Sequence, residues 1–208
     1  NSARPSRRGD PMTRDEQYLD LCPASPKISR IWAMPSHETF SIPPINALID
    51  RYLNDKPDLF ARNHRFDEIW VDPFVRNSAF KQKMKFCNDL CPEYDATHHM
   101  DALDFLRSLQ SGSVDGVLFD PPYSPRQISE CYQGVGRNVS TQDTQAAFWS
   151  KLKKEIGRIL NIGGIAISCG WNSGGCGKSN GFTTLEILIV PHGGWHNDTI
   201  ITVEEKRR

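Results

Sequence analysis

The stretch Val117-Leu118-Phe119-Asp120-Pro121-Pro122-Tyr123 decides how this chain is expected to fold. Its apolar residues are too few for a core helix and are typical of a short buried strand, which the two prolines must end. The Asp120 carboxylate, a peptide carbonyl and the Tyr123 ring are thereby predicted to lie together at the carboxyl end of a strand. In open α/β sheets this edge is where ligands bind. Taken alone, the tetrapeptide Asp-Pro-Pro-Tyr is also compatible with a simple strand-ending turn.

Short apolar runs on both sides of this stretch predict further strands, and helical spacing predicts the elements between them. The expected strands lie in residues 69–74, 84–90, 114–123 (which also contain the Asp-Pro-Pro-Tyr corner that ends the strand), 165–169, 184–190 and 199–204. Apolar side chains three and four residues apart predict helices over 45–53 (with Ser41 as N-cap), from Asp101 to Leu109, and over 145–160. This pattern is typical of an α/β sheet, and the spacing of the last two strands allows an antiparallel hairpin.

Length and composition limit the class of protein. At 208 residues, with 10% aromatic residues, the chain fits one domain with a sizeable core. No apolar run approaches the roughly 18 residues of a transmembrane helix. The formal net charge is zero, which is weak support for a nucleic-acid binder because duplex binders usually carry a basic excess. Any DNA-binding surface must therefore come from local clustering of charge.

The cysteines and the first residues indicate the compartment and the domain limits. Six cysteines are scattered along the chain, and Cys87 and Cys91 have no matching second pair, so no metal site is expected. Reduced thiols in a cytoplasmic protein fit best. Residues 1–27 are expected to be a flexible tail without the apolar core of a signal peptide, and residues 28–208 a single domain.

Acidic residues follow the predicted strands at the spacing of a nucleotide site. Asp89 lies 17 residues after Asp72, close to the roughly 20 residues at which nucleotide-binding folds place an acid on the ribose hydroxyls. A solvated turn residue is the alternative reading of Asp89. Asp101 is predicted to cap the helix that follows it, and capping is compatible with contact to a ligand.

In their order, these segments resemble the S-adenosylmethionine-dependent methyltransferases that modify exocyclic amino groups. The resemblance is to small adenine-specific (N6) DNA methyltransferases of phages and prophages, and it covers roughly residues 37–206. It implies a doubly wound, mostly parallel seven-stranded sheet with a terminal antiparallel hairpin and helices on both faces. The chain departs from the family at Val75-Arg76-Asn77-Ser78, where glycines normally let the backbone approach the ligand. Asn77 is the residue there most willing to take a left-handed conformation.

The resemblance also implies two binding sites and their residues. The catalytic residues would be Asp120, Pro121, Pro122 and Tyr123. S-adenosylmethionine would contact Thr39, Phe40, Ser41, Asp72, Pro73, Phe74, Asn77, Asp89, Leu90, Asp101, Ala102 and Asp120. The substrate would contact Tyr123, Ser124, Arg126, Arg137, Trp171 and Asn172, with residues 124–144 as a target-binding loop.

The implied chemistry gives each part of this corner a physical role. The amino lone pair of adenine is delocalised into the ring, and hydrogen bonds to the Asp120 carboxylate and the Pro121 carbonyl would favour a pyramidal nitrogen. Positioning and electrostatics would supply most of the catalysis. A base inside a duplex cannot reach such a corner, so it would be flipped out and stacked on Tyr123.

Three functions remain open at the level of sequence. The first is the DNA adenine methyltransferase, acting on double-stranded DNA in the cytoplasm of a bacterial or phage-infected cell. The second is an RNA methyltransferase with the same corner, since ribosomal-RNA enzymes of similar length also carry Asp-Pro-Pro-aromatic. The third is a non-catalytic module that binds cofactor or DNA, which the glycine-free turn motivates. Near-neutral charge and the lack of a separate recognition domain leave a homodimer open.

Overall fold

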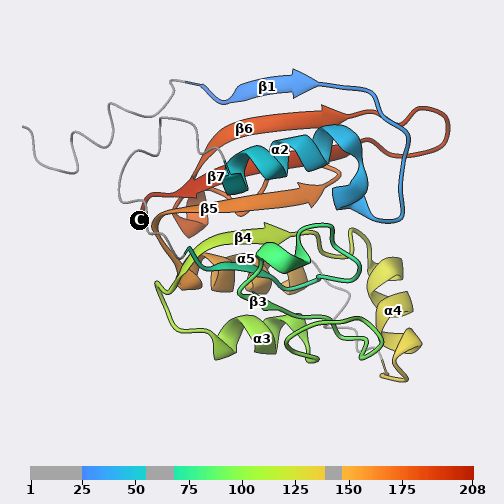
Figure 1. The fold of residues 1–208 in the computed structure, drawn as a ribbon, viewed down its shortest axis with the longest axis vertical. Helices are drawn as coiled ribbons and strands as arrows, with labels where there is room; N and C mark the ends of the chain where they lie inside the picture. The colour runs from blue at the N-terminus through green and yellow to red at the C-terminus, as the bar shows by residue number, and fades with distance from the viewer. Residues whose placement is uncertain (1–24, 55–67, 139–146) are drawn as a thin grey trace, which may run out of the picture.

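Seven strands form one mixed sheet in the computed structural model, which describes residues 25–54, 68–138 and 147–208. The strand order is β1-β6-β7-β5-β4-β2-β3, and β7 runs antiparallel to both of its neighbours while the other pairs are parallel. The strands are β1 (Lys27–Arg30), β2 (Trp70–Asp72), β3 (Phe86–Cys87), β4 (Val114–Phe119), β5 (Leu160–Gly170), β6 (Phe182–Val190) and β7 (Thr199–Lys206). Figure 1 shows the sheet and its helices. The predicted fold class is confirmed.

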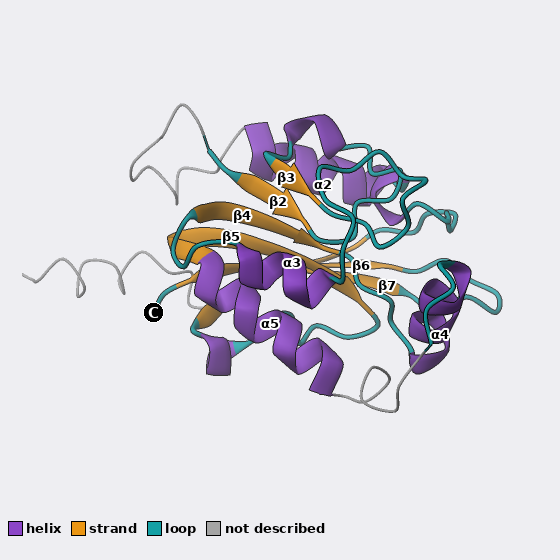
Figure 2. Ribbon diagram, turned by 90° about the horizontal axis from the view of Figure 1, so that it is seen from below, coloured by secondary structure: helices purple, strands orange, loops and turns teal. Residues whose placement is uncertain are grey.

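Helices cover both faces of the sheet (Figure 2). Helix α2 (Pro43–Asn54) lies on one face, and α3 (Ala102–Ser108) and α5 (Ala147–Ile159) pack side by side on the other. Each face has its own apolar core. The α2 side contains Ile45, Ile49, Leu118 and Ile167, and the α3/α5 side contains Phe105, Leu106, Val117, Phe119, Leu152 and Ile156. Burial of these side chains on both faces explains why β4 reads as a continuous apolar run.

The sheet reverses its winding direction at β2. The chain passes from β2 to β3 on one side, and β4 then returns to pair with β2 on the other side, with Val71 opposite Val117. Such a reversal leaves a crevice beyond the carboxyl ends of the strands. The residues that follow β2 and β4 therefore face a common space.

Several predicted elements differ from the structure in their bounds, and the differences are largest at β3 and at the start of β5. The strand expected over 84–90 is only Phe86–Cys87, and the backbone of Asn88 and Asp89 pairs instead with Asp72 and His98. The helix expected over 145–160 is Ala147–Ile159 within the described residues, and Leu160 already belongs to β5. The Gly163-Gly164 pair lies inside this strand, where Gly163 has φ 84°.

The strand β1 was missed because its sequence carries no strand pattern. Residues 27–30 form an edge strand that is mostly exposed, so no alternation of apolar and polar residues marks it. It is held by pairing with β6 and by Lys27, whose Nζ lies 3.2 Å from a carboxylate oxygen of Glu186. Lys27, expected at the end of a flexible tail, is therefore part of the sheet, and residues 1–24 lie outside the described residues.

The segment expected as a loop over 124–144 contains a helix, so that expectation was wrong for its first part. Helix α4 (Pro125–Gly134) begins at Ser124, whose Oγ accepts a hydrogen bond from Gln127 N at 3.2 Å. Pro125 takes the first helical position, where its missing N–H has no consequence. The helix carries no clear apolar pattern in the sequence, because its residues are mostly polar and its buried side chains are Ile128 and Tyr132. Residues 139–146 lie outside the described residues.

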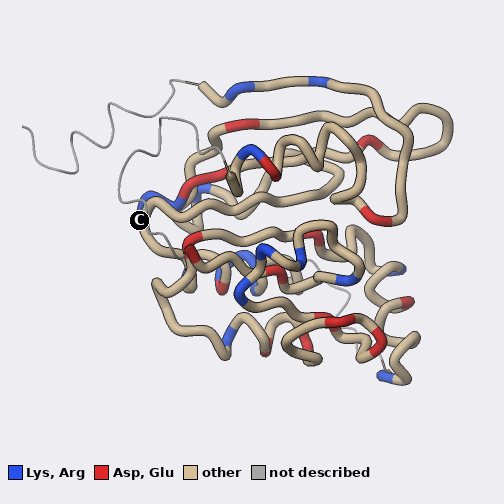
Figure 3. The backbone as a smooth tube through the Cα atoms, viewed as in Figure 1, with Lys and Arg blue, Asp and Glu red and all other residues tan. Residues whose placement is uncertain are grey.

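The charged residues are interspersed along the described chain, as Figure 3 shows, in keeping with the net charge of zero. Within the three described ranges, every helix falls short of the length and hydrophobicity that a bilayer crossing needs.

Candidate functional site

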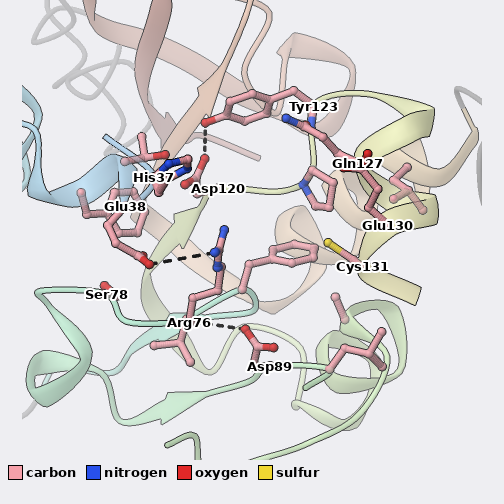
Figure 4. Close-up of a pocket in the computed structure, with 18 of the residues that line it drawn as sticks. His37, Glu38, Arg76, Ser78, Asp89, Asp120, Tyr123, Gln127, Glu130 and Cys131 are labelled. Atoms are coloured by element: carbon pink, nitrogen blue, oxygen red, sulfur yellow. Dashed lines mark hydrogen bonds and ion pairs between the residues drawn. The ribbon is translucent and has the colours of Figure 1, made fainter. Parts of the chain in front are cut away.

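A cavity of about 840 Å³ lies at the carboxyl ends of the strands, at the reversal point of the sheet. This volume is in the range of about 300–1,000 Å³ that small-molecule sites occupy. Its wall is built by the residues after β2, β3, β4 and β5, by the segment 35–42, by α4 and by the β6–β7 loop. Figure 4 shows side chains from these separate segments pointing toward one another.

Asp120 and Tyr123 form the corner that the sequence predicted. Asp120 follows β4, and the Tyr123 hydroxyl donates a hydrogen bond to Asp120 Oδ1 (Figure 4). Burial raises the pKa of Asp120, although hydrogen bonds from Tyr123 and Thr39 and the charge of Arg76 oppose that rise. Burial, together with the negative charge of Asp120, also raises the pKa of the Tyr123 hydroxyl well above its usual value. The pair therefore keeps a neutral phenol as donor beside a carboxyl group.

Asp72 lies behind the cavity wall rather than in it. It is fully buried at the end of β2, and Oδ1 accepts a hydrogen bond from Phe74 N at 2.9 Å. Burial, with the nearby charges of Asp120 and Asp89, raises the pKa of Asp72 to about 8. Its Oδ2 has no hydrogen-bond partner within the described structure. An uncharged carboxyl with one unused polar atom is left beside the crevice.

The raised pKa of Asp72 predicts a pH-dependent stability. The group is protonated in the folded protein up to about pH 8, whereas in the unfolded chain it ionises near its ordinary pKa of about 3.9. Its contribution to stability is thus complete below about pH 4 and is lost as the pH rises through 8. We expect the unfolding temperature to fall between about pH 4 and 8, to level off above about pH 8, and to fall less in Asp72→Asn. The control Asp104→Asn, on the exposed side of α3, should keep the wild-type profile, and identical profiles in all three proteins would contradict the argument.

Asp89 closes the turn that follows β2. Its Oδ2 accepts a hydrogen bond from Arg76 N at 3.1 Å and its Oδ1 one from Cys91 N at 2.9 Å. The side chain lines the cavity, and a carboxylate has about four acceptor positions, so further hydrogen bonds remain available. The reading of Asp89 as a solvated turn residue is wrong, because only 8% of it is exposed.

Asp101 caps α3 as predicted and also faces the cavity. Its Oδ1 accepts a hydrogen bond from Leu103 N at 3.0 Å. Its Oδ2 accepts one from the Tyr132 hydroxyl at 2.5 Å and pairs with Arg137 at 3.2 Å. Arg137, predicted to bind substrate, thus contacts an acid that was predicted to bind cofactor.

The segment before α2 forms the opposite wall of the cavity. Thr39 and Phe40 line it, whereas Ser41 turns away and hydrogen-bonds Glu38 O at 2.7 Å. Ser41 lies in the short helix Thr39–Ser41, so its expected role as N-cap of α2 is wrong. The first turn of α2 bonds instead to the carbonyl of Ile42.

The structure brings together most of the predicted site residues, but not all of them. Those that line the cavity are Thr39, Phe40, Pro73, Phe74, Asp89, Leu90, Asp101, Ala102, Asp120, Pro122, Tyr123 and Trp171. A neighbouring hollow of about 330 Å³ is lined by Pro121 and Asn172, and Tyr123 and Trp171 border both spaces. The remaining residues, Ser41, Asp72, Asn77, Ser124, Arg126 and Arg137, lie outside both linings. Arg126 projects into solvent, with 87% of its side chain exposed.

Several side chains that line the cavity were not predicted from the sequence. Tyr132 comes from the unpredicted helix α4, and Trp195 is fully exposed in the β6–β7 loop. Glu38 and Arg76 both line the cavity and form an ion pair, with Oε1 of Glu38 4.0 Å from Nη2 of Arg76. Arg76 occupies the turn already singled out for its lack of glycine, and that departure was the available signal.

Metal chemistry finds no support in the described residues. Among them no group of three or more histidine, cysteine or acidic side chains could hold a metal ion. The described cysteines are free: Cys87, Cys91, Cys131, Cys169 and Cys176. His98 packs its ring against Phe86 and Phe105, which gives it a structural role.

The fold is similar to those of solved structures, one of which is described as a putative methyltransferase. No protein-family model matches the chain, and no curated protein matches it. A structure of TrmN from Thermus thermophilus has a TM-score of 0.51 and 15% identity over 79% of this chain, which spans about half (49%) of the TrmN chain. A putative methyltransferase from Escherichia coli, yhhF, has a TM-score of 0.51 and 7% identity over 85% of this chain and 91% of its own. At such identities the likeness shows a shared Rossmann-like fold.

Proposed function

We propose that this protein transfers a methyl group from S-adenosylmethionine to the N6 amino group of an adenine flipped out of DNA. The observation that carries the proposal is the position of Asp120 and Tyr123. Asp-Pro-Pro-Tyr ends the strand at the reversal point of the sheet, and Asp120 faces the same cavity as Asp89 and Asp101. The fold likeness to a putative methyltransferase supports the class of reaction.

The cavity fits the proposed cofactor in size and in chemistry. Asp89 and Asp101 offer carboxylate oxygens to hydroxyl and amino groups, and the unpartnered Oδ2 of Asp72 lies close behind them. Pro73, Phe74 and Ala102 supply apolar surface for a nucleoside. When bound, S-adenosylmethionine supplies a methyl group on a sulfonium, which is a good leaving group.

Asp120 and its neighbours would prepare the amino group that receives the methyl. Asp120 accepts a hydrogen bond from the amino group, and Pro121 offers its carbonyl as a second acceptor. The Trp149 indole already donates to the next carbonyl, that of Pro122, at 2.8 Å, which holds the turn in place. Such fixed acceptors can orient the nitrogen lone pair without reorganisation at the moment of transfer.

Tyr123 would present its ring as the wall against which the extruded base rests. Its hydroxyl is held by Asp120, and Trp171 packs edge-on against it with ring centroids 5.8 Å apart. Both contacts fix the plane of the ring, and stacking on an aromatic surface is how many enzymes hold a flipped base. Trp171 and Asn172 follow β5 at the same edge and stay as proposed substrate contacts.

The functional test is the detection of modified bases in cells that express the protein. We expect N6-methyladenine in the DNA at a defined sequence, read by single-molecule sequencing, and none with Asp120→Ala. Nucleoside analysis of ribosomal RNA from the same cells tests the RNA alternative. Methylated RNA with unmodified DNA would replace the DNA proposal, and no modification of either by a folded protein that binds S-adenosylmethionine would favour a non-catalytic module.

A DNA substrate would also imply a binding partner and a cellular compartment for this protein. Double-stranded DNA would be the partner, in the cytoplasm of a bacterial or phage-infected cell. The described cavity rim carries few basic side chains, so a second copy of the chain would enlarge the surface available to a duplex. Light scattering with and without a DNA duplex would measure whether the protein is a monomer or a dimer.

A further inference from the structure

The glycine-free turn after β2 holds an arginine in a conformation that normally requires glycine. Arg76 has φ 39°, and among the described residues other than glycine it alone has a positive φ. Its N–H is tied to Asp89 Oδ2 at 3.1 Å, which keeps the turn in this shape. Strained backbone of this kind persists where the surrounding structure enforces it, and it is found mainly at ligand sites.

The turn directs the Arg76 side chain into the cavity. Figure 4 shows its guanidinium between Glu38 and the space below Asp120. Nη2 lies 4.0 Å from Glu38 Oε1, and the guanidinium carbon is 5.8 Å from the centre of the Tyr94 ring. Asn77, the next residue in the turn, donates to the same Glu38 oxygen at 3.3 Å. Two adjacent residues of the turn thus hold Glu38 from one side.

The charge of Arg76 stands out against its surroundings. The described lining of the cavity contains five acidic side chains, Glu38, Asp89, Asp101, Asp120 and Glu130, and Arg76 is its single arginine or lysine. An anionic group that enters this cavity is attracted to Arg76 and repelled by the rest of the wall. With 51% of the Arg76 side chain exposed and 31% of that of Glu38, both can reach a ligand.

We propose that Arg76 and Glu38 together bind the amino-acid end of S-adenosylmethionine, Arg76 its carboxylate and Glu38 its ammonium. This inference rests on the proposed function and deepens it by naming the subsite. A zwitterion presents one negative and one positive group a few ångströms apart, and this pair of side chains presents the complementary charges at 4.0 Å. A nucleic-acid phosphate fits less well, because a diester carries no positive group to offset the Glu38 carboxylate beside Arg76.

The arrangement also explains how the turn works without glycine. In a glycine-rich turn, backbone N–H groups approach the ligand directly. Here the backbone N–H of Arg76 is already used by Asp89, and the side chain takes over the anion-binding role. A guanidinium suits a carboxylate because its donors match the two oxygens.

The test compares two nucleosides that differ only at this end. S-adenosylhomocysteine carries the amino acid and 5′-methylthioadenosine lacks it, so calorimetric titration of both isolates the subsite without any turnover. In Arg76→Met the affinity for S-adenosylhomocysteine should fall roughly 10- to 100-fold, the size of a lost charge-assisted hydrogen bond, while that for methylthioadenosine should stay within about twofold. Arg76→Lys should recover much of the loss, and Glu38→Gln should also weaken only S-adenosylhomocysteine. Arg107→Met, an exposed position on α3, is the matched control for loss of positive charge.

The outcomes separate this inference from the proposed function. Equal weakening of both nucleosides in a folded Arg76→Met would mean that Arg76 only shapes the turn, and would overturn the inference alone. Unchanged binding of both would overturn it as well, and weaker binding of an oligonucleotide instead would assign Arg76 to phosphate. If neither nucleoside bound to the wild-type protein, the proposed function would fail and this inference with it. Thermal unfolding of each variant shows whether it is folded.

Discussion

Asp120→Ala is expected to abolish methyl transfer while leaving the fold intact. The carboxylate is the acceptor proposed to orient the amino group, and loss of one such preorganised contact typically costs about 100- to 1,000-fold in rate. Transfer of labelled methyl groups to DNA at saturating cofactor measures the effect. Asp120→Asn keeps one acceptor oxygen in place, so its rate should lie between those of wild type and alanine.

Structural damage must be separated from loss of chemistry in this experiment. Asp120 follows β4 and its side chain hydrogen-bonds with Tyr123 and Thr39 at the cavity, so the alanine variant should unfold near the wild-type temperature. Asp104→Ala is the matched control, since Asp104 is an exposed acid paired with Arg107 on α3. Wild-type turnover by Asp120→Ala would remove this residue from the mechanism and with it the central argument for the enzyme.

Gly116→Ala is expected to destabilise the fold more than any other single methyl addition in the sheet. A β-carbon at this position would overlap the ring of Trp70, its partner across the β2–β4 pair. Trp70 is 4% exposed and packed in the core on the α2 side, so its ring has no free space into which it could move. We expect the free energy of unfolding to fall by about 3 kcal/mol, the upper part of the range for overpacked cores, as measured by urea denaturation.

Two further variants make the argument about Gly116 specific. Gly134→Ala adds the same methyl at the end of α4, where a β-carbon meets no atom within 4 Å, and should change stability by less than about 0.5 kcal/mol. Trp70→Ala removes the ring that causes the overlap, so the double variant should lose less than the sum of the two single losses. Strict additivity, or a Gly116→Ala protein as stable as wild type, would show that the ring does not rest on Gly116.

The parts of the fold that were predictable are those where burial leaves a pattern in the sequence. β4 and the hairpin of β6 and β7 were found because their apolar side chains are buried on the sheet, and α3 because Asp101 caps an amphipathic turn. β1 and α4 were missed for the opposite reason. Both are largely exposed, and their positions depend on contacts with distant residues, such as Glu186 for β1 and Asp101 for α4.

The candidate site was predictable where a motif ties a residue to the end of a strand. Asp72 ends a strand, and Asp89 and Asp120 follow strands, so their meeting at one edge follows from the parallel sheet. Only the complete burial of Asp72 could not be foreseen. The pairing of Arg137 with Asp101 could not be foreseen, because it depends on the unpredicted helix α4. The role of Arg76 could not be predicted either. The sequence shows that the turn lacks glycine, but it does not show that the Arg76 side chain points into the cavity.

The pairing of β2 with β4 has a consequence for how this chain can change over time. Asp72 and Asp120 are carried by neighbouring strands whose register, Val71 opposite Val117, is set by the backbone ladder. The spacing between Asp72 and Asp120 is therefore set by main-chain geometry, and changes in peripheral segments such as α4 leave it intact. The rim of the cavity can then vary in sequence while the sheet stays the same, and the Escherichia coli structure has a similar fold at only 7% identity.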